Sequence, residues 1–250
     1  MNLLISGALG RMGRAVYEYA EKTDGIKTVC GVDVFASKST LPYPVYATFD
    51  EVKEKPDCII DFSSVSTLPC LLEYANKHHI PAVLCTTGYG EEEMALIKKH
   101  AVSNAVFKSA NMSLGVNVLV NLCKKASEIL KNFDIEIIEK HHNQKIDAPS
   151  GTALMLADGI KEVNPEKFYV YGREGKPGKR NADEIGIHAI RGGNIVGEHE
   201  VIFAGNNEVI SLKHEASSRA VFADGAIKAS LYIVNKDTGI FDMQDLINGK

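Results

Sequence analysis

The feature that most restricts the possible folds of this chain is a glycine-rich turn near its first residue. The apolar run Leu3–Ser6 leads directly into Gly7–Gly13, in which three glycines are spaced three residues apart, and a helix is expected from about Arg11. Glycines let a backbone turn tightly and approach a pyrophosphate closely, while the free N–H groups and the dipole of a helix N-terminus stabilise its charge. A glycine turn taken alone is equally compatible with a purely structural role.

An acidic residue at the end of the next predicted strand strengthens the nucleotide interpretation. Asp33 follows the strand Lys27–Val32 and lies twenty residues beyond Gly13. At this place a carboxylate can accept hydrogen bonds from the adenosine ribose hydroxyls of a dinucleotide. It would also repel a 2′-phosphate, and no arginine adjoins it, so the sequence favours NADH. Lys38 leaves NADPH open, because a lysine supplies charge without the planar fork of arginine.

Short apolar runs alternate with amphipathic stretches over the first 130 residues. This alternation is typical of a parallel sheet wrapped by helices, and it predicts a doubly wound α/β domain. The predicted strands are Leu3–Ser6, Lys27–Val32, Cys58–Phe62, Ala82–Cys85 and Ala105–Lys108, and the predicted helices are Arg14–Lys22, Thr67–His78, Glu91–Ala101 and Gly115–Leu130.

A different pattern follows, because Asp134–Lys140 alternates with period two and leads into a polar loop. Further on, glycine-containing turns separate Ile185–Arg191, Asn194–Ala204 and Glu208–Glu215, which predicts an antiparallel meander. We therefore expect a second, α+β domain with an open mixed or antiparallel sheet. Ala220–Val234 is again helical in its spacing.

The loop after that alternating strand combines a helix start with a positive charge. Ser150 is a suitable N-cap, which would leave the backbone N–H groups of Gly151 and Thr152 as an anion site. Lys145 adds a full positive charge nearby. A carboxylate ligand matches both features, although a lysine taken singly would be a solvated surface charge.

Two adjacent histidines precede this helix start. A histidine with a pKa near neutrality can exchange protons with a reducing imine or enamine, which makes His141 and His142 candidates for acid–base chemistry. Neighbouring strand residues point to opposite faces, so at least one of them is compatible with an ordinary structural role. No third ligand sits at a suitable spacing for zinc, and we expect no metal site.

The composition excludes several classes of partner. A charged fraction of 24% and a formal net charge of -4 give no reason to expect a nucleic acid or an anionic membrane, and a small molecule is the better expectation. No apolar run is long enough to cross a bilayer, and we expect no signal peptide. The five cysteines are odd in number and widely spaced, which suits reduced thiols in a cytoplasmic protein.

Several segments together resemble the 4-hydroxy-tetrahydrodipicolinate reductase (dihydrodipicolinate reductase) family. The most specific segment is the histidine pair followed by Lys145 and Asp147–Ala153. The similarity spans essentially the whole chain, in the same order and without large gaps. The other matching segments are Gly7–Gly13, Thr86–Gly88, Ser109–Ser113, Arg191–Gly193, Val196–His199 and Gly239–Met243.

The resemblance implies a Rossmann-like nucleotide domain at residues 1–112 and a substrate-binding domain at residues 113–218, whose open sheet builds a homotetramer. A C-terminal helix, residues 219–250, would return to the first domain. The implied activity is NADH- or NADPH-dependent reduction of 4-hydroxy-tetrahydrodipicolinate, a cyclic dicarboxylate, to tetrahydrodipicolinate in lysine and diaminopimelate biosynthesis.

The same resemblance assigns roles to individual residues. His141 is implied as proton donor or acceptor and Lys145 as a proton donor, while His142, Gly151 and Thr152 are implied to bind the substrate carboxylates. The implied cofactor-binding residues are Gly7, Ala8, Leu9, Gly10, Arg11, Met12, Asp33, Cys85, Thr86, Thr87, Ser109, Ala110, Asn111 and Met112.

Two positions depart from the family pattern, both on the cofactor side. Cys85 stands where glycine usually precedes Thr-Thr-Gly, and Met112 where phenylalanine usually follows the asparagine. Two other functions share the nucleotide turn and Asp33: another Rossmann oxidoreductase acting on an imino or semialdehyde acid, and a catalytically silent dinucleotide sensor. The first need not have the histidine–lysine loop, and the second would have little use for acid–base groups.

Overall fold

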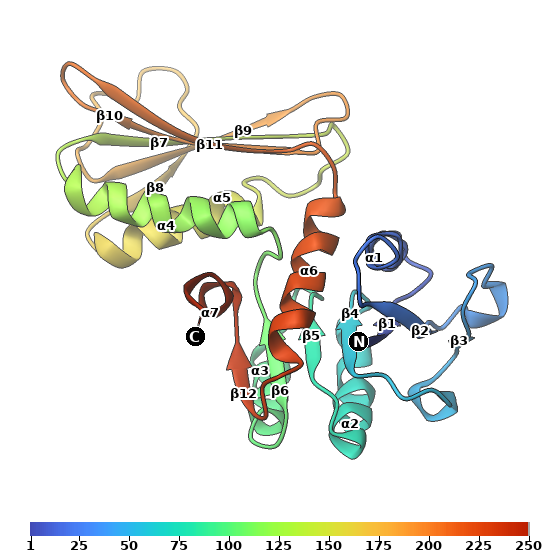
Figure 1. Ribbon diagram of the computed structural model, residues 1–250. Coiled ribbons are helices and arrows are strands. Elements are labelled where there is room, and N and C mark those ends of the chain that lie inside the picture. Colours follow the sequence, from blue (N-terminus) through green and yellow to red (C-terminus); the bar gives the residue numbers. More distant parts are fainter. Residues whose placement is uncertain (250) are drawn as a thin grey trace. The chain divides into compact units, whose positions relative to one another are not determined.

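The computed structural model describes residues 1–249, which form two compact units. Unit 1 consists of Met1–Leu114 together with the segment that begins at Arg219, and unit 2 of Gly115–Ser218. Each unit has its own sheet and its own helices (Figure 1). Over residues 1–249, no helix has both the length and the hydropathy needed to cross a membrane.

Unit 1 contains a seven-stranded sheet in which every strand pair is parallel, in the order β12-β6-β5-β4-β1-β2-β3. Its strands are β1 (Asn2–Ser6), β2 (Lys27–Val32), β3 (Val45–Tyr46), β4 (Cys58–Asp61), β5 (Ala82–Leu84), β6 (Ala105–Lys108) and β12 (Gly239–Phe241). Its helices are α1 (Arg11–Ala20), α2 (Leu68–His78), α3 (Glu91–His100), α6 (Ala220–Ile233) and α7 (Met243–Asn248), with short 3₁₀ turns η1 (Ala36–Lys38), η2 (Phe49–Glu51) and η3 (Val65–Thr67).

Alternation along the strands gives this sheet two apolar faces. Leu3 and Ile5 of β1 pack in one core cluster with Val16 of α1 and Ala226 of α6, while Leu4 packs in the other with residues of α2 and α3. Because both faces are covered, the strands consist mainly of apolar residues, with polar residues chiefly at their ends. The doubly wound parallel sheet predicted from the sequence is confirmed.

The order of the strands places a crevice where the nucleotide turn lies. The chain passes from β1 to β2 on one side, and β4 pairs with β1 on the other side. Ligands of open parallel sheets bind at the carboxyl ends of the strands, where the strand order reverses. The carboxyl end of β1 runs into Gly7, so the predicted turn occupies this position.

Unit 2 contains a five-stranded mixed sheet in the order β11-β10-β7-β9-β8. Helices α4 (Leu114–Ile129) and α5 (Gly151–Val163) share one hydrophobic core with the sheet, and both lie on the same side of it (Figure 1). Ile135 and Ile137 of the central strand point into this core, whereas Ile190, Val209 and Ile210 are exposed. The strands are β7 (Asp134–His141), β8 (Phe168–Tyr171), β9 (Glu184–Arg191), β10 (Gly197–Ala204) and β11 (Val209–Ala216).

The predicted meander is wrong in one connection. β10 and β11 form the expected antiparallel hairpin, but β9 does not pair with β10, because β7 lies between them. The glycine turn after β9 instead wraps around the end of β7, where the N–H of Gly192 donates to the His141 carbonyl (3.0 Å). A glycine turn marks where the chain reverses, but it does not determine which strand becomes the neighbour. Here β9 and β10 pair with the two opposite edges of β7 and not with each other.

Candidate active site

The nucleotide turn of unit 1 requires its glycines for reasons of space. Gly7 has a φ of +76°, and a Cβ atom there would lie 2.6 Å from the Phe62 carbonyl oxygen. A Cβ atom on Gly13 would lie 2.2 Å from the Gly7 carbonyl oxygen. Gly10 caps α1 without a side-chain hydrogen bond, and the first turn of a helix has N–H groups with no intrahelical partner. The turn therefore presents backbone donors at the start of α1.

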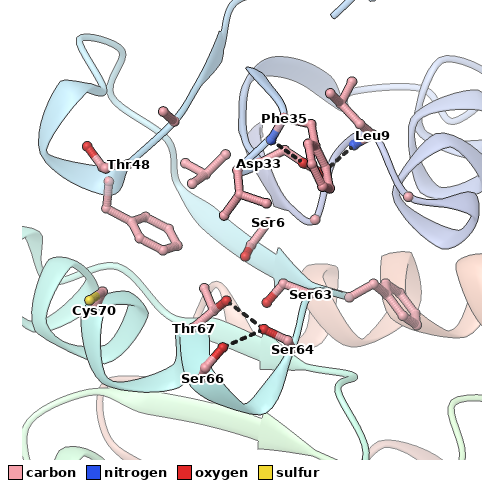
Figure 2. A pocket seen from close by; sticks show the side chains of 17 residues that line it. Ser6, Leu9, Asp33, Phe35, Thr48, Ser63, Ser64, Ser66, Thr67 and Cys70 are labelled. Carbon is pink, nitrogen blue, oxygen red and sulfur yellow. Dashed lines mark hydrogen bonds between the residues drawn. The ribbon is translucent and has the colours of Figure 1, made fainter. Parts of the chain in front are cut away.

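A cavity of about 650 Å³ adjoins this turn and contains Asp33 in its wall (Figure 2). One carboxylate oxygen of Asp33 accepts a hydrogen bond from the Leu9 N–H (2.9 Å) and the other from the Phe35 N–H (3.0 Å). The half-buried Asp33 is thereby fixed against the turn. Lys38 lies outside the cavity wall, with its Nζ atom 5.2 Å from the centre of the Phe35 ring.

A second hollow, of about 400 Å³, contains Cys85, Thr86 and Thr87 in its wall. It shares Phe62, Ser63 and Ser64 with the first cavity, so the two adjoin each other. Thr86 and Thr87 follow β5, and the Cys85 thiol is buried, which raises its pKa well above the ordinary value. Two of the three segments that the resemblance assigns to the cofactor are thus brought together.

Asp61 organises the second hollow and was not singled out from the sequence. It ends β4 and is buried, and it accepts hydrogen bonds from the Thr86 hydroxyl (2.7 Å) and the Ser63 hydroxyl (2.5 Å). A buried carboxylate must be hydrogen-bonded, and here it orients two hydroxyl groups of the hollow. The sequence signal that could have identified Asp61 is an aspartate at the end of an otherwise apolar strand.

Several residues implied by the resemblance lie outside both hollows. Ala8 is buried in the core, and Met12 packs against the same cluster. Met112 is buried near α6, where its carbonyl oxygen lies so close to Gly225 that a Cβ atom there would be 1.7 Å away. Their side chains therefore contribute to the core of unit 1, and their implied role at the cofactor stays a prediction. The remaining residues outside the two hollows are Arg11, Ser109, Ala110 and Asn111.

His141 ends β7 on the face that points into the core of unit 2. Its Nδ1 atom lies 2.6 Å from a carboxylate oxygen of Glu139, two residues earlier on the same face. Burial lowers the pKa of His141, an effect that the Glu139 carboxylate opposes and the positive charges of Lys145 and Arg191 reinforce. His141 therefore stays neutral down to a lower pH than an exposed histidine would.

Glu139 and Arg191 form a pair that sequence reasoning did not assign. The fully buried Glu139 accepts two hydrogen bonds of 2.7 Å from the guanidinium of Arg191, at the end of β9. Burial alone would raise the pKa of Glu139, but hydrogen bonds from Arg191, His141 and the Ser150 N–H hold it below its ordinary value. The sequence signal for this pair was the position of Glu139, which shares the buried face of β7 with Ile135 and Ile137. A charge on a buried face needs partners, so a partner for Glu139 was to be expected.

The helix start after the loop has the predicted cap. The Ser150 hydroxyl accepts from the Ala153 N–H (3.2 Å), and α5 begins at Gly151, which is exposed. The Nζ atom of Lys145 lies 2.8 Å from Asp147, within the same loop. Thr152 and His142 are half-buried.

His199, on β10, completes the arrangement around His141. The two imidazole rings meet edge to face with centres 5.1 Å apart, and the Nε2 atom of His199 lies 2.9 Å from the Ser150 hydroxyl. Burial, with a contribution from the neighbouring His141, lowers the pKa of His199 to about 4, so its ring is neutral near pH 7. Among residues 1–249, no group of three or more His, Cys, Asp or Glu side chains is arranged to hold a metal ion.

Comparison with known proteins places both units in one family. The family model "Dihydrodipicolinate reductase, N-terminus" matches residues 1–112, and "Dihydrodipicolinate reductase, C-terminus" matches residues 115–247. The chain belongs to the dihydrodipicolinate reductase family. The two matches together cover nearly all of the chain, which agrees with the resemblance inferred from its motifs.

Curated relatives in this family are similar over their full length. The chain is 50% identical to a 4-hydroxy-tetrahydrodipicolinate reductase from Caldanaerobacter subterraneus subsp. tengcongensis, covering 99% of this chain and 98% of the relative. It is 49% identical to the enzyme of the same name from Clostridium tetani, covering 99% and 97%. A solved structure of dipicolinate-bound dihydrodipicolinate reductase from Paenisporosarcina sp. TG-14 shares the fold, with a TM-score of 0.77, 23% identity and 97% coverage of each chain.

Proposed function

We propose that this chain reduces 4-hydroxy-tetrahydrodipicolinate to tetrahydrodipicolinate with NAD(P)H, in the diaminopimelate route to lysine. The reaction takes up one hydride and one proton and releases water. The observation that carries the proposal lies in unit 2, where a histidine held by a buried carboxylate shares a loop with a lysine and a capped helix start. Such a set can bind a carboxylate and transfer a proton.

The residues of unit 1 fit a dinucleotide, which supplies the hydride. Gly7 and Gly13 allow the tight backbone turn, because a Cβ atom at either position would collide with neighbouring backbone, and the adjoining cavity is large enough for an adenosine moiety. We assign the pyrophosphate to residues 7–12, the adenosine ribose to Asp33, and the nicotinamide to residues 85–87. We assign residues 109–112 to the edge of the cofactor site.

NADH should serve at least as well as NADPH. The Asp33 carboxylate stands in the cavity wall, which contains neither arginine nor lysine. A 2′-phosphate there would meet a negative charge with no fixed cation to offset it. Steady-state kinetics with both cofactors tests this, and a large NADPH preference would contradict it. Asp33→Asn should improve NADPH use relative to NADH, whereas Asp24→Asn, at an exposed loop position, should leave the ratio unchanged.

The substrate carboxylates are assigned to the start of α5. The N–H groups of Gly151 and Thr152 and the side chain of His142 would receive them, and Lys145 would exchange its ion pair with Asp147 for one with the substrate. His141 is assigned to proton transfer, and Lys145 donates a proton and offsets charge as the hydride is added.

A hydride-transfer assay decides between this function and the alternatives. Purified protein should oxidise NAD(P)H only when enzymatically generated 4-hydroxy-tetrahydrodipicolinate is present. Calorimetry with dipicolinate, the ligand in the Paenisporosarcina structure, should show binding that is weakened in a Lys145→Ala variant. Cofactor binding without turnover on this substrate would support a dinucleotide sensor, and turnover only on another imino or semialdehyde acid would support a different oxidoreductase.

The assembly is proposed to be a homotetramer in the cytoplasm. β11 is an edge strand of eight residues, and Val209 and Ile210 on it are exposed. An exposed strand edge with apolar side chains is typical of a surface that another subunit covers. All five cysteines are free thiols, which suits a reducing compartment. Light scattering at micromolar concentration tests the assembly, and a monomer alone would contradict it.

A further inference from the structure

The fully buried Glu139 divides its two carboxylate oxygens between separate parts of unit 2. One oxygen lies 2.6 Å from the Nδ1 atom of His141, and the other accepts a hydrogen bond from the Ser150 N–H (2.9 Å). Arg191 donates one N–H to each oxygen, at 2.7 Å in both cases. A single carboxylate therefore joins the histidine at the end of β7 to the N-cap of α5.

The bidentate pair with Arg191 explains how an ionised carboxylate can be fully buried in unit 2. Burying an ionised carboxylate costs several kcal/mol unless it is paired and hydrogen-bonded, and a planar guanidinium satisfies both oxygens at once. Arg191 is itself held in place, because its second terminal nitrogen also donates to the Asp147 carbonyl (2.8 Å). The arginine thus ties the loop that carries Lys145 to the same carboxylate.

The contact with Glu139 leaves the other ring nitrogen of His141 for exchange of a proton. Among residues 1–249, the Nε2 atom of His141 has no hydrogen-bond partner, and Gly197 lies beside it, where a Cβ atom would be 3.2 Å away. A carboxylate at Nδ1 selects the tautomer that carries a proton on that nitrogen. The ring is further held by His199, whose edge-to-face contact is in turn fixed by the Ser150 hydroxyl.

We infer that Glu139, kept ionised by Arg191, is the positioning residue of this site: it sets the tautomer and orientation of His141 and fixes the start of α5. The inference rests on the proposed function for the roles of His141 and α5. Glu139 is enclosed by its protein partners and acts only through them, so it is not assigned a contact with substrate.

The charges that face His141 determine what loss of Glu139 should do. Glu139 is the negative group, Lys145 and Arg191 are positive, and His199 is neutral near pH 7. In Glu139→Gln the negative charge disappears while both positive charges remain, so the pKa of His141 should fall further. Protonated His141 would then be present only at lower pH, and the limb of the pH profile of kcat that reports it should move towards acid.

The decisive experiment compares Glu139→Gln with Glu136→Gln on the same strand. Glu136 points to the opposite face of β7 and is likewise paired with arginine and histidine side chains, although it has two arginine partners where Glu139 has one. These partners are Arg173, Arg180 and His188. The two variants therefore lose the same charge from similar partners. Light scattering checks that assembly is unchanged in both.

Glu139→Gln should lower kcat by about ten- to hundredfold, as loss of a carboxylate that orients a working histidine does elsewhere, with a smaller rise in substrate KM. Its pH limb should move towards acid, while Glu136→Gln should keep the wild-type kcat and limb. Arg191→Lys keeps the charge but not the fork, so it should cost less in kcat and leave the limb near its wild-type position. A Glu139→Gln enzyme with reduced thermal stability but unchanged kcat and limb would overturn the inference, because Glu139 would then be only structural.

A measurement on the unmutated protein does not depend on any variant folding. Ring ¹⁵N chemical shifts, with His141 assigned by its absence in His141→Gln, should show neutral His141 protonated on Nδ1. Protonation on Nε2 would overturn the inference even if the enzyme is fully active. Absence of reductase activity in the wild type would instead remove the proposed function, so the two failures are distinguishable.

Discussion

The nucleotide turn of unit 1 and the histidine site of unit 2 are built in opposite ways. The turn consists of backbone atoms from one continuous segment. Its main requirement on the sequence is that Gly7 and Gly13 carry no side chain, because a Cβ atom at either position would collide with backbone. The histidine site is made of side chains from four segments, with Glu139 and Arg191 separated by 52 residues of sequence. The turn should therefore be sensitive to added volume, whereas the histidine site should be sensitive to a single lost charge or hydrogen bond.

Removal of the proton-transfer group is the strongest test of this contrast. His141→Gln should lower kcat by about a hundred- to ten-thousandfold, the usual range for general acid–base help, with a smaller effect on substrate KM. The dissociation constant for NADH, measured by fluorescence, should barely change, because the dinucleotide is assigned to the turn in the other unit. Near-native turnover combined with lost NADH binding would mean that the loop faces the cofactor.

Removal of the lysine charge should have a smaller and broader effect. Hydrogen bonds to charged groups contribute about 1.5–3 kcal/mol, so Lys145→Ala should lower kcat/KM by about ten- to hundredfold. The loss should divide between kcat and KM, because the charge attracts a carboxylate before the reaction and offsets charge during it. Lys176→Ala, at an exposed position of unit 2, is the control and should match the wild type.

Added volume should damage the turn while leaving the histidine site intact. A Cβ atom on Gly13 would lie 2.2 Å from the Gly7 carbonyl oxygen, so Gly13→Ala must displace the turn, and overpacking of this kind costs about 1–3 kcal/mol. Thermal stability and NADH affinity should both fall, while the tautomer of His141 should not change. Gly192→Ala, where a Cβ atom has open space, should leave NADH affinity unaltered. Equal NADH affinity in both variants would show that the turn does not hold the cofactor.

The smallest expected effect is a pH dependence of stability that arises in unit 2. Between about pH 6.5 and the folded pKa of about 4, His199 binds a proton in the unfolded chain but not in the folded one, so stability falls as pH falls. From pH 7 to pH 5 the free energy of unfolding should decrease by about 2 kcal/mol from this group.

Urea unfolding at the two pH values measures this effect. His199→Gln, which retains a hydrogen-bonding group for the Ser150 hydroxyl, should show a weaker pH dependence than the wild type. His78→Gln, at an exposed position of α2, should keep the wild-type dependence. An unchanged slope in His199→Gln would mean that His199 binds its proton equally in the folded and unfolded chains, and so contributes nothing to the pH dependence.

Much of unit 1 could be predicted because its signals are local. Each parallel strand is a short apolar run, and the turn, its helix and Asp33 lie within the first 33 residues. The structure places Asp33 beside the turn, where its carboxylate accepts a hydrogen bond from the Leu9 N–H, and its role at the adenosine ribose stays a prediction. The N-cap at Ser150 was predictable for the same reason, because a cap depends on the three residues that follow it.

The strand order of unit 2 was decided only by the tertiary structure, and so was the carboxylate that holds His141. A period-two pattern identifies β7, but it does not say that β9 and β10 take its two edges. Glu139 reaches Arg191 and His141 nears His199 only because of that order. Backbone geometry over a few residues is fixed by local sterics and is therefore readable in the sequence, whereas a buried charge depends on which distant side chains the packed sheet brings to it.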